Sequence, residues 1–600
     1  MPMKNNLEMT WLRHRTWAQL ILLVVICFIA YSNTFHVPFV FDDVKEIVEN
    51  KIIRNFDYFW NFSAASGLPS FHGLKMRTLG YLTLAMNYRL GGVNVVGYHI
   101  FNFVTHLLTS LLVFKFIGQT LRLQQSGPTD NSHPKSLVPF LVALLFAVHP
   151  IQTEAVTYII QRLASLAAFF SLLSLTSYIH ARLEMGHKRS GKALAWFVLS
   201  LLSTVAAMKT KEIAFTLPVV IVLYEFLFLQ GRVWKRWCIL LPQLLTMLII
   251  PLSLTGTGEP VGKIISHASA LSRVDQVVSR GDYLCTQFRV IITYLRLIIF
   301  PINQNVDHDF PLHPNFFSPE VLFSFLFLTI LFCMAVYLTG VRLPLSKFDN
   351  FSNLATPYES LSAKAAARLV GFGILWFFIT LSVESSIIPI NDVMNEHRLY
   401  FPSVGIFLAL VVTVRQLVAR FDFRFPRVHQ VTPAVVAMVI LLLAGTTFAR
   451  NQIWQDKLGL WQDVIKKNPR NARGYNNLGA YYDQQGDYEK AIAYFQKAVA
   501  IKPDFPEALF GLGISHAALK QTDIAIAYYQ RALSFQPKNP EILFNLGVIY
   551  MNKGLFGPAG DAFQKALQLD PKMNQARMFL DYARQQTGNQ PTPAKNETSK

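Results

Sequence analysis

Long apolar runs constrain the fold of this chain more than any other feature of its sequence. They recur through residues 1–450, at lengths close to the ~20 residues with which a helix crosses a bilayer. Only 15% of the 600 residues are charged, against roughly a quarter in a soluble domain. We expect spanning helices at 17–35, 95–116, 137–149, 157–180, 193–208, 212–229, 238–255, 319–340, 367–390, 403–419 and 431–449. The sequence therefore predicts an all-α fold, with a polytopic membrane bundle of about eleven spans and a C-terminal soluble region.

Basic residues are distributed unevenly among the loops between these runs. With eleven spans, the most basic loops, which carry residues such as Arg15, Arg182 and Arg236, all fall on one side. Because loops rich in Lys and Arg stay in the cytoplasm, we expect a cytoplasmic N-terminus and place residues 450–600 in a periplasm or lumen. This topology accounts for the net charge of +19, so we expect no nucleic-acid partner.

The first apolar run, Trp17–Ala30, has the basic flank of a signal peptide. No small-residue cleavage site follows it, and many apolar runs come later, so we interpret it as a retained first span. We expect an integral protein of a bacterial inner membrane, or of the endoplasmic reticulum membrane if the source is eukaryotic. The four cysteines are scattered and form no Cys-x-x-Cys pair, which argues against a disulfide framework or a zinc site.

Residues 281–301 do not fit the series of spans. The segment is half apolar but contains Arg289 and Arg296, and counting it as a span would reverse the charge pattern of every later loop. We therefore expect a helix at the outer interface, or a partly re-entrant one. The outer side then carries the long polar loops 36–94, 256–318 and 384–402, which is where binding or chemistry is expected.

The C-terminal region contains an internal repeat with a period of 34 residues. The recurring positions are Leu478-Gly479, Leu512-Gly513 and Leu546-Gly547, then Ala491, Ala525 and Ala559, then Ala498, Ala532 and Ala566, and finally Pro503, Pro537 and Pro571. This is the tetratricopeptide pattern of two helices per repeat, with small residues where the helices touch. We expect a membrane domain at 1–450, a linker and leading half repeat at 451–471, three repeats at 472–573, and a capping helix and disordered tail at 574–600. The groove of the repeats is expected to bind an acceptor polypeptide or an adaptor protein.

Two adjacent carboxylates, Asp42 and Asp43, follow the first span after the apolar approach Phe39-Val40-Phe41. Most acids at such a position only solvate a loop or cap a helix. An acid held at the membrane boundary can also keep a pKa suited to proton abstraction. From their position alone, a catalytic role for these acids therefore stays open beside the structural one.

Three further polar turns, at residues 149–154, 209–212 and 396–400, fall on the same predicted side of the membrane. Each is more simply a solvated turn or a snorkelling cation, but their coincidence with Asp42 indicates a shared polar site. Arginines there would bind a phosphate through bidentate, charge-assisted contacts. The candidate phosphate ligands are Arg162, Lys211, Arg296, His397 and Arg398, and the candidate lining residues are His149, Glu154, Glu396 and Tyr400.

Several common site motifs are absent from the sequence. Gly256–Lys263 has the wrong glycine spacing for a phosphate loop, and there is no His-Glu-x-x-His or Gly-x-Ser-x-Gly. The triplet Asp307-His308-Asp309 has the ligand types of a metal site, although a solvated loop is the more economical interpretation. We expect no cofactor and no resident metal, and the sequence leaves metal dependence open.

The order of these motifs resembles one protein family over nearly the whole chain. The matching residues are Phe41-Asp42-Asp43, Gly97-Tyr98-His99 with Asn102 and His106, His149-Pro150 with Glu154, Lys211-Glu212, Tyr294-Leu295-Arg296 with Pro301, and Glu396-His397-Arg398-Leu399-Tyr400. They are similar to the transmembrane and tetratricopeptide-containing O-mannosyltransferases and their bacterial relatives. The resemblance implies an inverting glycosyltransferase of the polytopic GT-C class. Such enzymes use a polyprenyl-phosphate-linked sugar and a catalytic base in the first outer loop, and this role carries over to Asp42, with Asp43 as helper or substitute. They hold the donor phosphate with arginines near the membrane surface.

Two other functions remain open at the level of sequence. The chain could be a non-catalytic membrane-anchored scaffold or assembly factor whose repeats recruit other proteins. It could also transfer a lipid-linked sugar to a glycan, or act as a ligase of whole lipid-linked oligosaccharides. An anchor needs no acids and bases gathered at one face, so wide separation of Asp42, Arg162 and His397 would favour the scaffold.

Overall fold

The structure is a computed structural model that describes residues 2–125, 136–254, 279–340, 361–386, 389–390, 392–424 and 428–588. These residues form helices and loops, with no β-strand among them, which confirms the predicted all-α fold. The chain divides into two compact units, Met1–Asp456 and Lys457–Lys600. The expected boundary at 450 lies slightly earlier because the last helix of the first unit continues to Ile453. Residues 256–263 and 589–600, which carry two of our sequence predictions, lie outside the described ranges.

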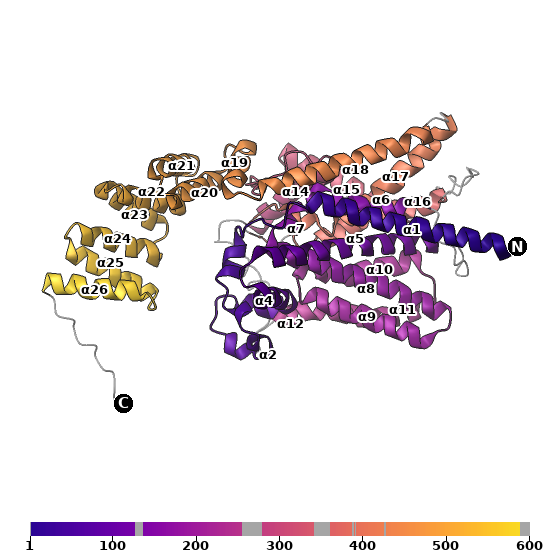
Figure 1. The fold of residues 1–600 in the computed structure, drawn as a ribbon, viewed down its shortest axis with the longest axis horizontal. Coiled ribbons are helices and arrows are strands. Elements are labelled where there is room, and N and C mark those ends of the chain that lie inside the picture. The colour runs from indigo at the N-terminus through magenta and orange to yellow at the C-terminus, as the bar shows by residue number, and fades with distance from the viewer. Residues whose placement is uncertain are drawn as a thin grey trace. The chain divides into compact units, whose positions relative to one another are not determined.

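The first unit is a bundle of long apolar helices (Figure 1). Its principal helices are α1 (Pro2–Tyr31), α5 (Val95–Gln125), α6 (Val138–Val148), α8 (Arg162–Gly186), α9 (Ser190–Met208), α10 (Leu217–Phe228), α11 (Val233–Leu245), α12 (Ile249–Leu254), α15 (Pro319–Thr339), α16 (Ala363–Leu381), α17 (Ser403–Arg424) and α18 (Val428–Ile453). In the described ranges, nine helical segments are long and apolar enough to cross a membrane. Val138–Val148 and Pro150–Thr157, bent by 52°, form a tenth if they are one broken span. The chain is therefore an integral membrane protein, as predicted.

The expected span at 212–229 is the one without a counterpart of sufficient length. It consists of a 3-10 turn, η6 (Glu212–Thr216), followed by α10, and is shorter than the ~20 residues of an ordinary span. It nevertheless runs from one end of the bundle to the other, because Glu212 pairs with Arg77 beside the start of α8 and Glu225 pairs with Arg182 near the end of α8. A broken helix of this kind is tolerated where neighbouring helices satisfy its backbone.

One end of the bundle gathers the connections that carry the candidate site. There α1, α6, α9 and α16 finish and α5, α8 and α17 begin, and we call it the loop end. Short helices cover it: α2 (Asp57–Trp60), α3 (Phe71–Met76), α4 (Thr78–Gly91) and α7 (Thr153–Thr157), with the turns η1 (Val44–Val48), η2 (Ile52–Arg54), η3 (Phe62–Ala65), η4 (Pro150–Gln152), η5 (Ile159–Gln161) and η8 (Glu396–Leu399). Buried hydrogen bonds tie these pieces together, for example from Thr34 to Thr157 and from Thr157 to Asn451.

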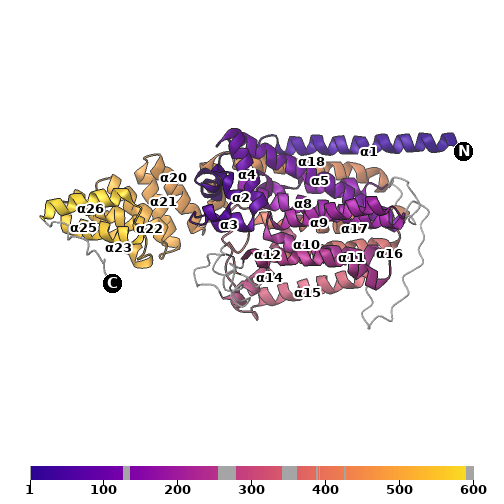
Figure 2. The same cartoon turned by 90° about the horizontal axis from the view of Figure 1, so that it is seen from below.

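Helix α14 (Arg280–Ile299) is the segment that sequence analysis excluded from the spans. It follows α12, whose Ser253 lies at the loop end against Lys209, and it precedes α15, on which its Phe288 packs. Figure 2 shows α12, α14 and the adjoining end of α15 together at one end of the bundle. Tyr283 and Tyr294 donate hydrogen bonds to backbone carbonyls of the loop that precedes α17. Helix α14 therefore packs on the loop end and does not pass from one end of the bundle to the other.

A buried ion cluster lies at the opposite end of the bundle. Glu225 of α10 is fully buried and pairs with Arg182 at 2.8 Å and with Arg236 at 3.1 Å. Tyr178 donates a further hydrogen bond of 2.9 Å to the same carboxylate. Ionisable groups at this depth are costly unless they are paired. The cluster joins α8, α10 and α11, and loss of any one partner would leave a buried group unpaired.

The second unit is a stack of helix pairs. After α19 (Lys457–Lys467) come α20 (Ala472–Gln484) with α21 (Tyr488–Ile501), α22 (Pro506–Ala518) with α23 (Thr522–Phe535), α24 (Pro540–Asn552) with α25 (Phe556–Leu569), and finally α26 (Asn574–Thr587). The recurring glycines mark close contacts within each pair. A Cβ on Gly513 would overlap the Tyr529 ring, and Gly479 and Gly547 face Phe495 and Phe563 in the same way.

Replacing Gly513 by valine should destabilise the second unit by about 1–3 kcal/mol, because the new side chain overlaps the buried Tyr529 ring. Chemical denaturation of residues 457–600, followed by circular dichroism, would measure the loss. The matched control is Gly557→Val, at a helical glycine where an added Cβ would have no neighbouring atom within 4 Å, and it should lose less stability than Gly513→Val. Equal stability of the Gly513→Val and control proteins would show that the glycine contact is not needed for packing.

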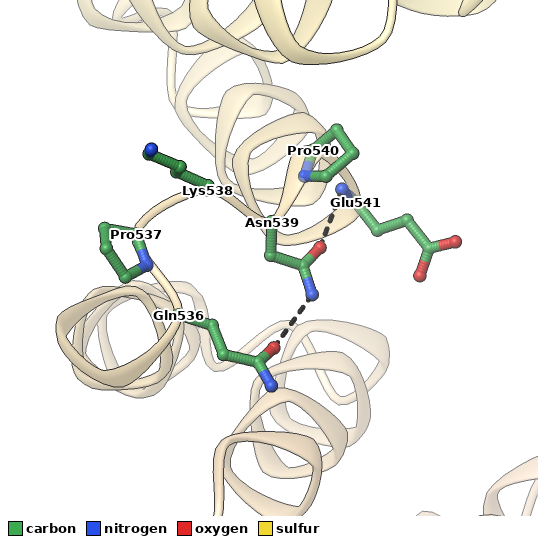
Figure 3. Close-up of a pocket in the computed structure, with 6 residues that line it drawn as sticks. All are labelled: Gln536, Pro537, Lys538, Asn539, Pro540 and Glu541. Atoms are coloured by element: carbon green, nitrogen blue, oxygen red, sulfur yellow. Dashed lines mark hydrogen bonds between the residues drawn. The ribbon is translucent and has the colours of Figure 1, made fainter. Parts of the chain in front are cut away.

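A shallow hollow lies at the turn between α23 and α24 (Figure 3). It is lined by the consecutive residues Gln536–Glu541. Asn539 organises the turn, since its Oδ1 accepts from the backbone N–H of Glu541 at 3.0 Å and its Nδ2 donates to Gln536 Oε1 at 3.0 Å. The hollow is thus the inside of a capped inter-repeat turn, and we assign it no ligand.

Candidate functional site

The two adjacent acids of the first loop have different environments. Asp43 is fully buried, and its carboxylate accepts hydrogen bonds from the backbone N–H groups of Ile160 at 2.8 Å and Val40 at 3.2 Å. Burial raises the pKa of Asp43 to about 7, against the opposing effects of these hydrogen bonds and of Arg162. Such a side chain anchors the loop and has no surface for a substrate. The sequence-based suggestion that Asp43 could replace Asp42 as the base therefore does not fit this geometry.

Asp42 is exposed, although its neighbour is buried. Partial desolvation, together with the charges of Glu46 and Asp392, raises the pKa of Asp42 above its usual range. Phe41 before it has φ +49°, an uncommon backbone conformation for a residue other than glycine. Its ring packs against the rings of Tyr158 and Trp454, whose centroids lie 5.6 Å and 6.2 Å from its own. The loop thus holds Asp42 outward and Asp43 inward through a locally strained turn that aromatic packing maintains.

Residues 154–162, which we call the connector, contact most of the predicted site. Glu154 accepts hydrogen bonds from Nδ1 of His397 at 2.7 Å and from its backbone N–H at 2.9 Å. Farther along the connector, the Tyr158 hydroxyl accepts from the backbone N–H of Asp42 at 2.9 Å. Ile160 then binds Asp43, as described above. One short segment therefore brings the acid loop and the turn η8 together, as the prediction of a shared polar site requires.

Arg162 ends the connector and is fully buried. Its Nε donates to Asn102 Oδ1 at 3.0 Å, and its terminal nitrogens donate to Asn87 Oδ1 at 2.6 Å and to the Tyr98 carbonyl at 3.0 Å. Its guanidinium also lies over the Phe101 ring at 4.6 Å. These contacts occupy all three nitrogens, so Arg162 braces the start of α8 and is not placed to receive a donor phosphate.

A second group of charges surrounds the turn η8. Lys211 Nζ pairs with Glu384 Oε1 at 2.9 Å, and both side chains are largely buried. Arg398 donates to the carbonyls of Val393 at 3.0 Å and Asp392 at 2.6 Å. Burial opposes ionisation of Glu384, but Lys211 and Arg398 outweigh it and lower its pKa. Burial and the charge of Lys211 hold the pKa of His397 well below its usual value, which favours a neutral imidazole there.

Glu396 connects this group to a loop that sequence analysis left almost unassigned. Its carboxylate accepts from Gln304 Nε2 at 2.8 Å, from the backbone N–H of Asn305 at 2.8 Å and from His308 Nε2 at 2.9 Å. Glu396, which was predicted to line the site, therefore holds residues 304–308 by hydrogen bonds. Among the described residues, no three His, Cys, Asp or Glu side chains are grouped as metal ligands.

Three other predicted site residues make their own contacts outside this group of charges. Tyr400 is buried in the bundle, where its hydroxyl is 2.8 Å from Nδ1 of His106. His149 is also buried and packs on Phe407 at 5.2 Å. Arg296 is exposed on α14 and donates to the Ile302 carbonyl at 2.9 Å. The structure therefore brings together Asp42, Glu154, Lys211, Glu396, His397 and Arg398, but places Tyr400 and His149 in the core and Arg296 apart.

Tyr158 has no signal in the sequence that marks it as a site residue. It falls inside the run 157–180, which has the apolar composition of a span, and nothing in the run marks the extended residue that separates α7 from η5 at that position. The salt bridge between Arg77 and Glu212, at 2.9 Å, was also unforeseen. The hydrogen bond between Asp42 and Tyr158 and the salt bridge between Arg77 and Glu212 each join positions far apart in the chain, so no local pattern could have indicated them.

Fold and site together define a polytopic membrane protein with C-terminal tetratricopeptide repeats. Family models described as "Tetratricopeptide repeat" match residues 472–505 and 540–573, and one described as "TPR repeat" matches 515–554. Part of the chain is similar to two solved structures, "Crystal structure of MamA" (24% identity, 22% of this chain, 77% of that chain, TM-score 0.21) and "Crystal structure of YrrB: a TPR protein with an unusual peptide-binding site" (22% identity, 22% of this chain, 69% of that chain, TM-score 0.21).

Curated relatives extend the similarity into the membrane bundle. The chain is 26% identical over 84% of its length to "Protein O-mannosyl-transferase Tmtc3" of Drosophila melanogaster, 25% identical over 84% to TMTC3 of Homo sapiens, and 24% identical over 80% to TMTC4 of Mus musculus. It spans 58%, 53% and 66% of these proteins. The predicted resemblance is confirmed: the curated relatives of this chain are transmembrane and tetratricopeptide-containing protein O-mannosyl-transferases.

Proposed function

We propose that this chain is a membrane glycosyltransferase that moves a mannose-like sugar from a polyprenyl-phosphate donor to a hydroxyl group of a protein acceptor. The observation that carries the proposal is the pair of acids at the loop end, where a buried Asp43 fixes the loop and an exposed Asp42 is left free to react. A mere membrane anchor has no need for this arrangement, or for the connector that ties Asp42 to a cluster of charged side chains. The names of the curated relatives support the same activity.

Asp42 acts as the general base in this mechanism. A serine or threonine hydroxyl is a weak nucleophile until a base begins to remove its proton. As the acceptor oxygen bonds to the anomeric carbon, the bond from that carbon to the donor phosphate breaks, and polyprenyl phosphate leaves with the electron pair. Attack from the face opposite the leaving group inverts the anomeric configuration. The proton ends on Asp42, and negative charge develops on the phosphate.

The cations around η8 are suited to stabilise that developing charge. Lys211 and Arg398 lie in the same cluster as His397, whereas Arg162 and Arg296 do not belong to it. The ammonium group of Lys211 has three N–H donors, and one of them pairs with Glu384. We place the donor phosphate beside Lys211, with the lipid chain entering from the bilayer. The terminal nitrogens of Arg398 already bind the Val393 and Asp392 carbonyls, so Arg398 contributes positive charge without a direct contact. The loop end then faces a periplasm or lumen, and the repeats recruit the acceptor polypeptide or an adaptor on that side.

Sugar transfer within membranes tests this proposal directly. We expect membranes that contain the wild-type chain to move label from polyprenyl-phosphate mannose into protein, in a form released by β-elimination from serine or threonine. Membranes from the same host without the chain are the control. Label that depends on a nucleotide sugar after the lipid-linked pool is depleted would contradict the assigned donor. Absence of transfer, with acceptor proteins captured by residues 457–600, would instead favour the scaffold.

A further inference from the structure

Tyr158 occupies a central position among the contacts of the acid loop. It is 5% exposed, and its extended backbone separates α7 from η5. Its hydroxyl accepts the backbone N–H of Asp42 at 2.9 Å, and its proximity lowers the pKa of the Asp42 carboxyl against the larger, opposite effect of burial. A phenol oxygen that accepts one hydrogen bond still has its own proton to donate. The Tyr158 proton is therefore available to the carboxylate proposed as the base.

The tyrosine ring holds the same loop from a second side. It packs against Phe41 at 5.6 Å and against Trp454 at 5.8 Å. Phe41 is the residue with the positive φ of +49°, so the ring supports the strained turn that sends Asp42 outward. Two residues farther on, Ile160 binds the buried Asp43. The connector therefore fixes the place of Asp42 through its backbone N–H and keeps the Tyr158 hydroxyl near its carboxylate.

We propose that Tyr158 is a positioning residue that orients Asp42 and donates a hydrogen bond to its carboxylate. This inference rests on the proposed function, because it assigns Tyr158 a role through the general base of that reaction. A hydrogen bond to the ionised form of a carboxyl favours that form, so the hydroxyl keeps more of Asp42 deprotonated at a given pH. The sign of the effect follows: removing the hydroxyl should make Asp42 harder to ionise.

The test compares wild type with Tyr158→Phe and Tyr178→Phe. The control also removes the hydroxyl of a buried tyrosine bonded to a carboxylate, since Tyr178 donates to Glu225 at 2.9 Å, but it does so at the opposite end of the bundle. We expect the acid limb of the pH–rate profile for sugar transfer to move upward by about one pH unit in Tyr158→Phe, and to stay in place in Tyr178→Phe. A loss of rate with an unmoved acid limb would mean that the hydroxyl has only a structural role, and would overturn the inference.

A second readout does not depend on turnover. Carbodiimides react with protonated carboxyl groups, so the pH dependence of Asp42 modification, followed by mass spectrometry of the purified full-length chain, reports its ionisation. The midpoint should rise in Tyr158→Phe by the same amount as the acid limb and remain unchanged in the control. An unchanged midpoint in folded Tyr158→Phe protein would contradict the inference. If the wild-type chain transfers no sugar but the midpoint still rises in Tyr158→Phe, the proposed function has failed and the Tyr158 contact has not.

Discussion

Replacing Asp42 by asparagine is expected to reduce sugar transfer by about 100- to 10,000-fold, the range that a positioned general base contributes. Asparagine has nearly the same shape and keeps the backbone N–H that binds Tyr158, but its amide does not accept the proton of the acceptor hydroxyl. Because Asp42 is exposed, the substitution should leave expression and thermal stability close to wild type. The measurement is label transfer from polyprenyl-phosphate mannose at equal protein level.

Two matched variants make this result specific. Asp57→Asn removes an exposed carboxylate from the same polar loop region and should transfer sugar normally. Asp43→Asn should behave differently from both, because an amide nitrogen would replace one of the oxygens that accept from Val40 and Ile160. It should lower the amount of folded protein along with activity. Full activity in Asp42→Asn would remove Asp42 from the mechanism, and equal loss in Asp57→Asn would point to a general effect of loop charge.

Replacing Glu225 by leucine is expected to lower the free energy of unfolding by about 3–5 kcal/mol, the usual result of breaking a buried ion pair from one side. The substitution leaves the guanidinium groups of Arg182 and Arg236 without the carboxylate they share, and leaves the Tyr178 hydroxyl without its acceptor. The loss should appear as a lower midpoint of unfolding for the detergent-solubilised protein.

The pair of Glu184 with Arg189 provides the control for this effect. Its atoms are 3.7 Å apart, and the arginine side chain is 61% exposed, so Glu184→Gln should cost less than about 1 kcal/mol. Replacing Glu225 together with both arginines by apolar residues should recover part of the stability lost in the single variant, because no buried charge then remains unpaired. A Glu225→Leu protein as stable as the Glu184→Gln control would show that solvent reaches the cluster.

Local patterns in the amino-acid sequence were sufficient to predict the architecture of this protein and the region of its candidate site. Apolar runs of bilayer length predicted the membrane bundle, and the period of 34 residues predicted the repeats. Both signals depend only on composition and spacing along the chain. The Gly513 position shows why such a signal is dependable, since the recurring glycine reflects one close contact with an aromatic ring in every helix pair.

The availability of each polar residue for chemistry, by contrast, depends on tertiary contacts. Asp42 and Asp43 are equivalent in the sequence, but one is exposed and the other is buried against Ile160. Arg162 has the charge of a phosphate ligand, yet the polar atoms around it already take its hydrogen bonds. Tyr158 had no signal at all. The exposure and the hydrogen-bond partners of a side chain depend on segments that are distant in the chain and adjacent in the folded protein. Composition, spacing and periodicity do not specify which segments become adjacent.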